Sequence, residues 1–341
     1  MTVDFQSIGP GKVKHVQINV GRLYDLTDIH LNLRIQKGKK DGPILFITAA
    51  IHGDEINGIE IIRRLLQQKA LKNLCGTLIT VPIVNIFGFN NRSRYLPDRR
   101  DLNRCFPGSS TGSLAARLAH TLMTEVVLKS TCGIDLHTGA VHRNNLPQIR
   151  AHLDNSKTNK LARAFGAPVI LNSTFRDGSL RFAAHERNIP ILLFEGGEAL
   201  RFDDKVTKVG VRGILSVMEK MKMLPEGTVG SGLISDEAYV AKNSFWLRAP
   251  ESGLAKGIKK LGAYVEAGDL LAFITSPYGD SKVALRAPHS GIIIGASALP
   301  LVTKGDAMYH IATFDENLDD VRESLETYED EFLDGHMPSI I

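Results

Sequence analysis

The stretch Pro43-Ile-Leu-Phe-Ile-Thr-Ala-Ala-Ile-His-Gly-Asp-Glu55 joins an apolar run to a short group of chemically active side chains. The run from Ile44 to Ile51 predicts a β-strand buried on both faces, as in a parallel sheet. A helical pattern of apolar residues begins near Asn57, so His52 and Glu55 are expected on a tight turn between strand and helix. Open α/β sheets hold their active sites at such turns, which makes this stretch the expected centre of the fold.

Two interpretations of the His52-x-x-Glu55 spacing are open at this point. An imidazole and a carboxylate are ligands that a catalytic zinc ion accepts, together with one more protein ligand and a water molecule. Alternatively, the segment is an ordinary helix start, in which Asp54 caps the helix, Glu55 favours its dipole and His52 has no special role. Three later stretches of the chain favour the metal site.

The segment Cys132-Gly-Ile-Asp-Leu-His-Thr-Gly139 predicts a short strand that ends in polar residues. Residues two apart on a strand share a face, so Asp135 and His137 should point the same way. His137 is the candidate third metal ligand. Asp135 either forms a hydrogen bond to a metal-binding residue and orients it, or simply faces solvent.

The segment Ile189-Pro-Ile-Leu-Leu-Phe194 predicts another strand, and Glu195-Gly-Gly-Glu198 follows it. A carboxylate at the end of a buried strand, followed by two glycines, is an exposed catalytic position in such folds. Glu195 is therefore the candidate general base, and Glu198 is its local competitor.

Residues 85–108 show no clear period and predict a long loop. Irregular loops of this length inside a compact domain are usually functional or disordered, and the aromatic residues here favour an ordered loop. Guanidinium groups suit carboxylates and oxyanions, although each could instead lie on a solvated surface. The loop carries five of them: Arg92, Arg94, Arg99, Arg100 and Arg104.

The rest of the chain up to residue 236 predicts further strands and helices. Strands are expected over 14–20, 30–35, 78–84 and 167–171, and helices over 57–70, 114–129, 180–187 and 206–221. Residues 224–236, rich in proline, glycine and serine, predict a linker. His142 and His152 fall in polar segments, where a surface role is expected for both.

The composition is that of an ordinary globular protein. The chain has 341 residues, 43% hydrophobic and 23% charged, without the roughly 18 continuous apolar residues of a membrane helix. The N-terminus lacks the pattern of a secretory signal. Three cysteines without a Cys-x-x-Cys motif fit a reducing cytoplasm and argue against a disulfide framework or a thiolate zinc site. A cytoplasmic location without a membrane partner is therefore expected.

The net charge of +4 is unevenly distributed along the chain. Residues 315–334 carry ten acidic side chains and one basic one, so the rest of the chain carries +13. The positive net charge of residues 1–314 and 335–341 can attract nucleic acid or small anions. The absence of a basic cluster interleaved with aromatic residues favours a small anionic substrate over nucleic acid. The acidic tail, 315–341, is expected to be a solvated helix or a partly disordered end.

The C-terminal part of the chain contains an internal repeat. Arg248-Ala-Pro-Glu-Ser-Gly253 recurs as Arg286-Ala-Pro-His-Ser-Gly291, and Val265-Glu-Ala-Gly-Asp269 recurs as Val302-Thr-Lys-Gly-Asp306. Two similar β units of this size predict a small pseudo-symmetric barrel. The expected division is a catalytic domain over 1–235, a β domain over 245–314 and the acidic tail over 315–341.

Taken together and in this order, four elements resemble the succinylglutamate desuccinylase and aspartoacylase family. They are His52-x-x-Glu55, Asp101-Leu-Asn-Arg104, Leu136-His-Thr-Gly139 and the strand that ends at Glu195. The resemblance covers about residues 10–222 and implies an α/β fold with a zinc carboxypeptidase-like mixed sheet flanked by helices. It implies one zinc ion per chain, with His52, Glu55 and His137 as ligands and Glu195 activating water.

The resemblance also implies how the substrate is held. Arg94 would steady the tetrahedral oxyanion. The spacing from Arg94 to Arg104 is longer than in aspartoacylase itself, so Arg99 or Arg100 could take that role instead. Three residues would hold the carboxylate of the substrate: Asn103, Arg104 and Arg181.

The C-terminal repeat resembles a lipoyl or biotinyl carrier domain. In such domains the modified lysine sits on the hairpin between the two halves. Here Asp280 occupies the matching position, and Lys282, two residues away, lacks the usual Met-Lys-Met or Asp-Lys-Ala surroundings. A β-barrel without a prosthetic group is therefore expected, which caps or narrows the active site or builds a homo-oligomer.

These features predict a zinc-dependent deacylase that cleaves the amide bond of a small N-acyl amino acid, such as an N-acetyl or N-succinyl compound. One alternative is a metallocarboxypeptidase acting on short peptides, which a C-terminal appendage that narrows the cleft would disfavour. Another is a non-catalytic carrier or binding protein modified at Lys282. Two imidazoles and a carboxylate suit zinc best, and cobalt or manganese could also bind.

Overall fold

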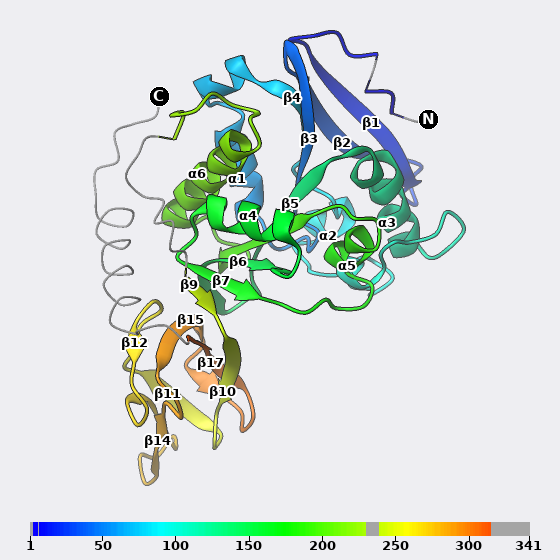
Figure 1. Ribbon diagram of the computed structural model, residues 1–341. Coiled ribbons are helices and arrows are strands. Elements are labelled where there is room, and N and C mark those ends of the chain that lie inside the picture. The colour runs from blue at the N-terminus through cyan, green and yellow to red at the C-terminus, as the bar shows by residue number, and fades with distance from the viewer. Residues whose placement is uncertain (1–2, 6, 230–238, 315–341) are drawn as a thin grey trace.

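The computed structural model describes residues 3–5, 7–229 and 239–314. A large mixed sheet runs through the molecule, with helices on both faces and a smaller β unit at one end (Figure 1). The predicted acidic tail, 315–341, and the second half of the predicted linker lie outside the described residues. No helix in the described part is both long and apolar enough to cross a membrane.

After three consecutive strands, strands and helices mostly alternate through the first two thirds of the chain. The strands are β1 (Val13–Arg22), β2 (Asp28–Lys37), β3 (Lys40–Ala49), β4 (Cys75–Val81), β5 (Cys132–Gly139), β6 (Arg143–Ala151), β7 (Val169–Asn172), β8 (Ile191–Glu198) and β9 (Tyr239–Ala241). The α-helices are α1 (Asn57–Leu65), α2 (Ile86–Asn90), α3 (Leu114–Glu125), α4 (Ser156–Phe165), α5 (Leu180–His185) and α6 (Asp204–Lys220). Short 3-10 helices are η1 (Lys69–Asn73), η2 (Leu102–Arg104) and η3 (Val127–Lys129).

The part of the large sheet formed by the first two thirds of the chain has the strand order β1-β2-β4-β3-β5-β8-β6. The four central strands β4, β3, β5 and β8 are parallel to their neighbours in this group, whereas β1, β2 and β6 join antiparallel. The predicted mixed α/β sheet flanked by helices is therefore confirmed. Its parallel centre brings the carboxyl ends of β3, β5 and β8 to one edge, where such folds place their ligands.

Two apolar cores lie on opposite faces of this sheet. Leu45 and Ile47 pack into one core, under α1, α4 and α6, while Phe46 packs into the other, with α3 and α5. Successive residues of a strand point to opposite faces, so β3 needs apolar residues at every position to bury both. The prediction that this strand is buried on both faces is confirmed.

Some predicted segments differ from the observed elements, and one observed strand has no predicted counterpart. The helix predicted over 57–70 ends at Leu65, and a 3-10 helix follows it. The predicted loop 85–108 contains α2 and η2. Strand β6 was not predicted, because it is rich in polar residues and has Pro147 in its middle. A proline removes a ladder hydrogen bond, and the pairing of β6 with β8 shifts register at this point, between Asn145 and Gln148.

The C-terminal β unit contains β10 (Asn243–Arg248), β11 (Gly253–Gly257), β12 (Tyr264–Val265), β13 (Leu270–Thr275), β14 (Lys282–Arg286), β15 (Gly291–Ser297), β16 (Leu301–Val302) and β17 (Ala307–Thr313). The sequence repeat reappears in its backbone. Each copy has a two-residue strand, and Gly268 and Gly305 both have φ of +92° in the turn that follows. This conformation favours glycine at both positions.

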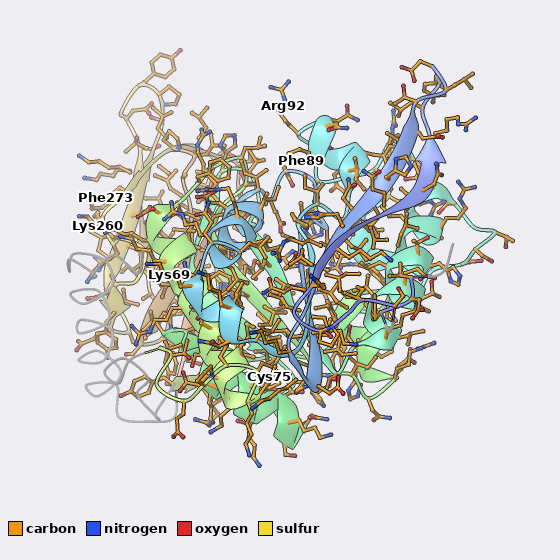
Figure 2. All side chains as sticks on the ribbon, turned by 90° about the horizontal axis from the view of Figure 1, so that it is seen from above. Lys69, Cys75, Phe89, Arg92, Lys260 and Phe273 are labelled. Carbon is orange, nitrogen blue, oxygen red and sulfur yellow. The ribbon has the colours of Figure 1, made fainter. Side chains whose placement is uncertain are left out.

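The C-terminal β unit continues the large sheet. Strand β15 pairs with β6 through Gly295, opposite Asn145, and β17 and β10 follow it in the same sheet. The strands β14, β13, β11 and β16 form a separate four-stranded sheet. In Figure 2 this unit, marked by Lys260 and Phe273, lies to one side of the helices. Because it joins the sheet at β6, it is placed close to the end of β8.

Candidate functional site

Three of the predicted site residues, His52, His137 and Glu195, lie at the carboxyl ends of neighbouring parallel strands. His52 follows β3, and Ala49 of that strand pairs with Leu136 of β5. On the other side of β5, His137 pairs with Glu195 of β8. Glu195 lies within β8, which continues to Glu198, and not after its end as predicted. The register of two strand pairs thus brings these side chains to one edge of the sheet.

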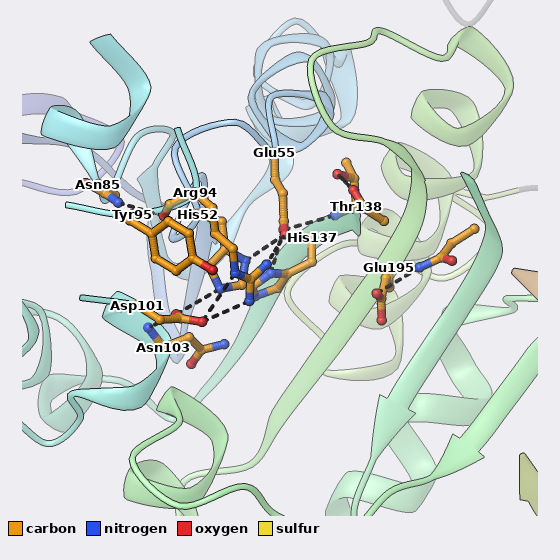
Figure 3. A network of polar contacts seen from close by, with 12 residues as sticks. His52, Glu55, Asn85, Arg94, Tyr95, Asp101, Asn103, His137, Thr138 and Glu195 are labelled. Atoms are coloured by element: carbon orange, nitrogen blue, oxygen red, sulfur yellow. Dashed lines mark hydrogen bonds and ion pairs between the residues drawn. The ribbon is translucent and has the colours of Figure 1, made fainter. Parts of the chain in front are cut away.

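His52, Glu55 and His137 form a compact buried cluster (Figure 3). The Nδ1 atom of His52 lies 2.7 Å from one carboxylate oxygen of Glu55, and the Nδ1 atom of His137 lies 2.7 Å from the other. The three residues are 4%, 2% and 5% exposed, respectively. One ligand atom from each lies within 4.8 Å of the other two, so all three could hold a single metal ion.

Two aspartates fix the outer nitrogens of the imidazoles. The Nε2 atom of His52 lies 3.1 Å from Asp101, and that of His137 lies 2.8 Å from Asp135. Asp135 also accepts a hydrogen bond of 2.8 Å from the hydroxyl of Thr48. Asp135 is 1% exposed, so of the two alternatives open for it, support of His137 is correct and exposure to solvent is wrong. Partners of this kind set the orientation of metal-binding histidines.

The charges of the cluster stabilise one another against burial. Burial lowers the pKa of His52, but the charge of Glu55 and the contact with Asp101 raise it above its ordinary value. Burial likewise lowers the pKa of His137, and Asp135 and Glu55 raise it well above its ordinary value. Burial raises the pKa of Glu55, yet the two imidazoles hold it well below its usual range. The carboxylates of Glu55, Asp101 and Asp135 thus stabilise positive charge on the two imidazoles.

The local structure does not match an ordinary helix start. The N-cap of α1 is Ile56, which makes no side-chain capping hydrogen bond. The Oδ1 atom of Asp54 is buried without a partner among the described residues, so Asp54 does not act as the cap. The carboxylate of Glu55 points to both histidines and also accepts from the backbone N–H of Thr138 at 3.2 Å. This geometry favours the metal-site interpretation.

Gly53 lets the turn between β3 and α1 lie against α2. A Cβ atom at this position would lie 2.0 Å from the carbonyl carbon of Gly88 and 2.2 Å from the nitrogen of Phe89. Backbone atoms cannot move aside as a flexible side chain can. The glycine between His52 and Glu55 is therefore required by close packing, which no local sequence pattern indicates.

We expect Gly53→Ala to lower the free energy of unfolding by about 1–3 kcal/mol, the usual cost of overpacking a well-packed site. The cluster of the variant should also have a lower affinity for a divalent metal ion, because the backbone that carries His52 and Glu55 must shift. Denaturant unfolding and metal titration measure the two effects. Gly9→Ala is a suitable control, since a Cβ there meets only Lys12, at 3.7 Å. Equal stability of the two variants would contradict the packing argument.

Glu195 lines the cavity that contains the cluster, held by two residues of β6. The side-chain amide of Asn145 donates a 2.8 Å hydrogen bond to one of its oxygens, and the Nε atom of Arg150 lies 2.5 Å from the other. Its competitor Glu198 instead accepts from the backbone N–H of His142 and is not among the described residues that line the cavity. No sequence pattern marks Asn145 and Arg150, because the polar residues and the central proline of β6 conceal the strand.

Arg94 contacts the cluster directly. Its Nη1 atom donates to Glu55 at 3.2 Å, and its Nη2 atom donates to Asp101 at 3.0 Å. Arg99 and Arg100, the alternatives for its predicted role, are exposed and absent from the described residues that line the cavity. Arg92 extends away from the body of the protein (Figure 2). Only Arg94 and Arg104 of the five loop arginines line the cavity in the described part of the chain.

The three predicted carboxylate-binding residues lie together in the cavity wall. The side-chain oxygen of Asn103 accepts from the backbone N–H of Leu180 at 2.9 Å, which ties η2 to the first turn of α5. That helix carries Arg181, which is 9% exposed and whose pKa burial lowers to about 10. The Nη1 atom of Arg181 is buried without a hydrogen-bond partner among the described residues. Such an atom favours an anionic ligand.

The cavity itself has a volume of about 690 Å³ and is rich in arginine. Its wall also contains five residues that were not predicted as site residues: Ala241 at the end of β9, Lys242 after it, and Asn243, Ser244 and Trp246 on β10. In sequence they are about 100 or more residues from the cluster, and no motif marks them. The arginines are Arg94, Arg104, Arg143, Arg150, Arg176 and Arg181.

Comparison with known proteins gives a consistent result. A family model described as the succinylglutamate desuccinylase/aspartoacylase catalytic domain matches residues 41–221. N-alpha-acetyl-L-2,4-diaminobutyric acid deacetylase of Halomonas elongata is 27% identical over 301 residues, which is 82% of this chain and 84% of that protein.

Two solved structures share the fold along nearly the whole chain. The ectoine utilization protein EutE of Ruegeria pomeroyi superposes with a TM-score of 0.79 at 23% identity, over 92% of this chain and 98% of its own. A succinylglutamate desuccinylase/aspartoacylase from Rhodobacter sphaeroides superposes with a TM-score of 0.79 at 25% identity, over the same shares of the two chains, 92% and 98%.

Proposed function

We propose that this chain, which belongs to the succinylglutamate desuccinylase/aspartoacylase family, is a zinc-dependent deacylase that cleaves the amide bond of a small N-acyl amino acid. The observation that carries the proposal is the buried cluster of His52, Glu55 and His137 in one cavity with Glu195 and several arginines. The Halomonas elongata relative, named as a deacetylase of an N-acetyl amino acid, supports the same class of reaction.

The donor set fits one zinc ion. Both outer nitrogens are engaged by Asp101 and Asp135, so the two Nδ1 atoms and the carboxylate of Glu55 are the groups left to bind a cation. When bound, zinc would polarise the acyl carbonyl and lower the pKa of a water molecule toward neutrality.

Glu195 is the proposed general base. It takes a proton from the attacking water as the C–O bond forms, and it passes that proton to the amine nitrogen as the C–N bond breaks. The hydrogen bond from Asn145 orients the carboxylate for both transfers. Arg94, beside the cluster, is the proposed donor to the oxyanion, a contribution typically worth about 3–4 kcal/mol.

A panel of substrates tests the proposed reaction. The zinc-loaded protein should release the free amine from N-acetyl or N-succinyl amino acids. A colorimetric amine assay measures this release. Short peptides with a free carboxylate should be poor substrates. If the protein cleaved the peptides but not the N-acyl amino acids, it would be a metallocarboxypeptidase and not a deacylase.

Arg181 is the residue that we expect to recognise the carboxylate of the substrate. Arg181→Met should lower kcat/KM for an N-acyl amino acid by about 10- to 100-fold, because a hydrogen bond to a charged group contributes about 1.5–3 kcal/mol. Most of the change should appear in KM. The same variant should lose little activity toward the corresponding amino acid amide, which has no carboxylate to bind.

Arg187→Met is the matched control for this experiment. Arg187 follows the same helix but donates to the backbone oxygen of Ala183 and does not line the cavity in the described structure. Its replacement should leave KM unchanged. An equal loss toward acid and amide substrates in Arg181→Met would contradict a role in carboxylate binding.

The proposed division of the chain places a catalytic domain over 1–235 and a β domain of lipoyl or biotinyl type over 245–314. The repeated turns at Gly268 and Gly305 support this assignment. Lys282 begins β14, and its Nζ atom lies 3.7 Å from the centre of the Phe273 ring. We propose that the β domain narrows the cavity, since Trp246 contributes to its wall.

A further inference from the structure

Trp246 brings an aromatic ring from the C-terminal β unit into the wall of the catalytic cavity. It lies on β10, in the same sheet as β8 but four strands away. The preceding residue, Phe245, packs against the core of the β unit and does not line the cavity in the described structure. Successive residues of a strand point to opposite faces, so β10 presents one ring to each side.

Two side chains hold the indole ring in place. The imidazole of His310 stacks on it, with ring centres 4.7 Å apart and an angle of 8° between the planes. The guanidinium carbon of Arg143 lies 5.2 Å from the ring, a cation–π contact. His310 is 4% exposed, and burial lowers its pKa to about 3, so the stacked imidazole is neutral. These two contacts hold the indole of Trp246 in a fixed position in the wall of the cavity.

The ring lies on the Glu195 side of the cavity. A Cβ atom on Gly295 would be 2.8 Å from the Oδ1 atom of Asn145 and 3.5 Å from the Cη2 atom of Trp246, so both side chains border this glycine. Asn145 in turn donates its hydrogen bond to Glu195. Asn103, by contrast, lies on the other side of the metal-binding cluster from Glu195 (Figure 3).

The proposed roles of these residues define how an N-acyl amino acid would lie in the cavity. The scissile carbonyl must lie between the cluster and Glu195, and the carboxylate lies toward Asn103, Arg104 and Arg181. The acyl chain is on the far side of the carbonyl from the amine, so it extends toward the wall formed by the β unit. We propose that Trp246 is a specificity-determining residue that restricts the substrate to short acyl chains. The inference rests on the proposed deacylase function.

The test compares N-acetyl, N-butyryl and N-hexanoyl derivatives of one amino acid. The unaltered protein should prefer the acetyl compound. Trp246→Ala should raise kcat/KM for the hexanoyl compound relative to the acetyl compound by about tenfold or more, since each additional methylene needs space in an apolar pocket. Trp246→Phe should give an intermediate ratio.

Phe245→Ala is the matched control. It removes an aromatic ring from the adjacent position of β10, and so it loosens the β unit without opening the cavity. It should leave the ratio of the acyl compounds unchanged. An unchanged ratio in Trp246→Ala, or an equal change in Phe245→Ala, would overturn the role of Trp246.

A second measurement does not depend on the stability of these variants. Trp246 is the only tryptophan of the chain, so its fluorescence reports directly on this wall. Titration of Glu195→Gln with the N-acetyl amino acid should change the emission in a saturable way. A saturable change without turnover by the unaltered protein would support the role of Trp246 and contradict the proposed hydrolysis. Turnover without any change in emission would overturn the role of Trp246 and leave the hydrolysis in place.

Discussion

Glu195→Gln is expected to lower kcat by about 10²- to 10⁴-fold, the usual contribution of a general base. Glutamine has nearly the same shape and can still contact Asn145, but it cannot accept the proton of the attacking water. Zinc content should be unchanged, because Glu195 is not part of the cluster of His52, Glu55 and His137. Turnover of an N-acyl amino acid and zinc analysis of the same preparation measure both quantities.

Glu198→Gln is the control for this variant. Glu198 lies on the same strand and accepts from the backbone of His142, outside the described wall of the cavity. Its replacement should change kcat little. If Glu195→Gln retained both zinc and full activity, the assignment of the base would be wrong and another proton acceptor would be needed.

His137→Ala is expected to reduce bound zinc to well below one ion per chain and to remove nearly all activity. It leaves only His52 and Glu55, and catalytic zinc sites use three protein ligands. Asp135→Asn should have a smaller effect, lowering metal affinity by about 10- to 100-fold, because Asp135 only orients the imidazole. Equilibrium dialysis against zinc would separate the two effects.

His15→Ala provides the control for non-specific binding by surface histidines, since His15 is exposed on β1. It should retain one zinc ion per chain with unchanged affinity. Retention of a full equivalent of zinc by His137→Ala would locate the metal elsewhere in the protein and would contradict the proposed centre.

Local patterns were sufficient to predict the elements that carry the cluster. The apolar run before His52, the short strand before His137 and the strand that runs into Glu195 each stand out within a few residues of sequence. A strand buried on both faces must be apolar throughout, so a polar residue that follows it is conspicuous. The family resemblance then supplied the roles, which the geometry of the buried cluster supports.

The environment of Glu195 could not be predicted in the same way. Its partners Asn145 and Arg150 belong to β6, whose polar residues and central proline conceal the strand. Trp246 reaches the cavity only because β15 pairs with β6 and carries β17 and β10 with it. No periodicity in a single segment records a pairing between strands that are distant in sequence.

The amino-acid sequence alone determined the α/β class of this protein, the strand ends that carry its polar residues and the repeat in its C-terminal part, because each depends on neighbouring residues. Only the tertiary structure decided which of these residues meet. Glu55 contacts His137 across 82 positions of sequence, and the wall that faces Glu195 comes from another part of the chain altogether. Such contacts depend on strand register and sheet order, which set the distances between side chains after the whole sheet has formed.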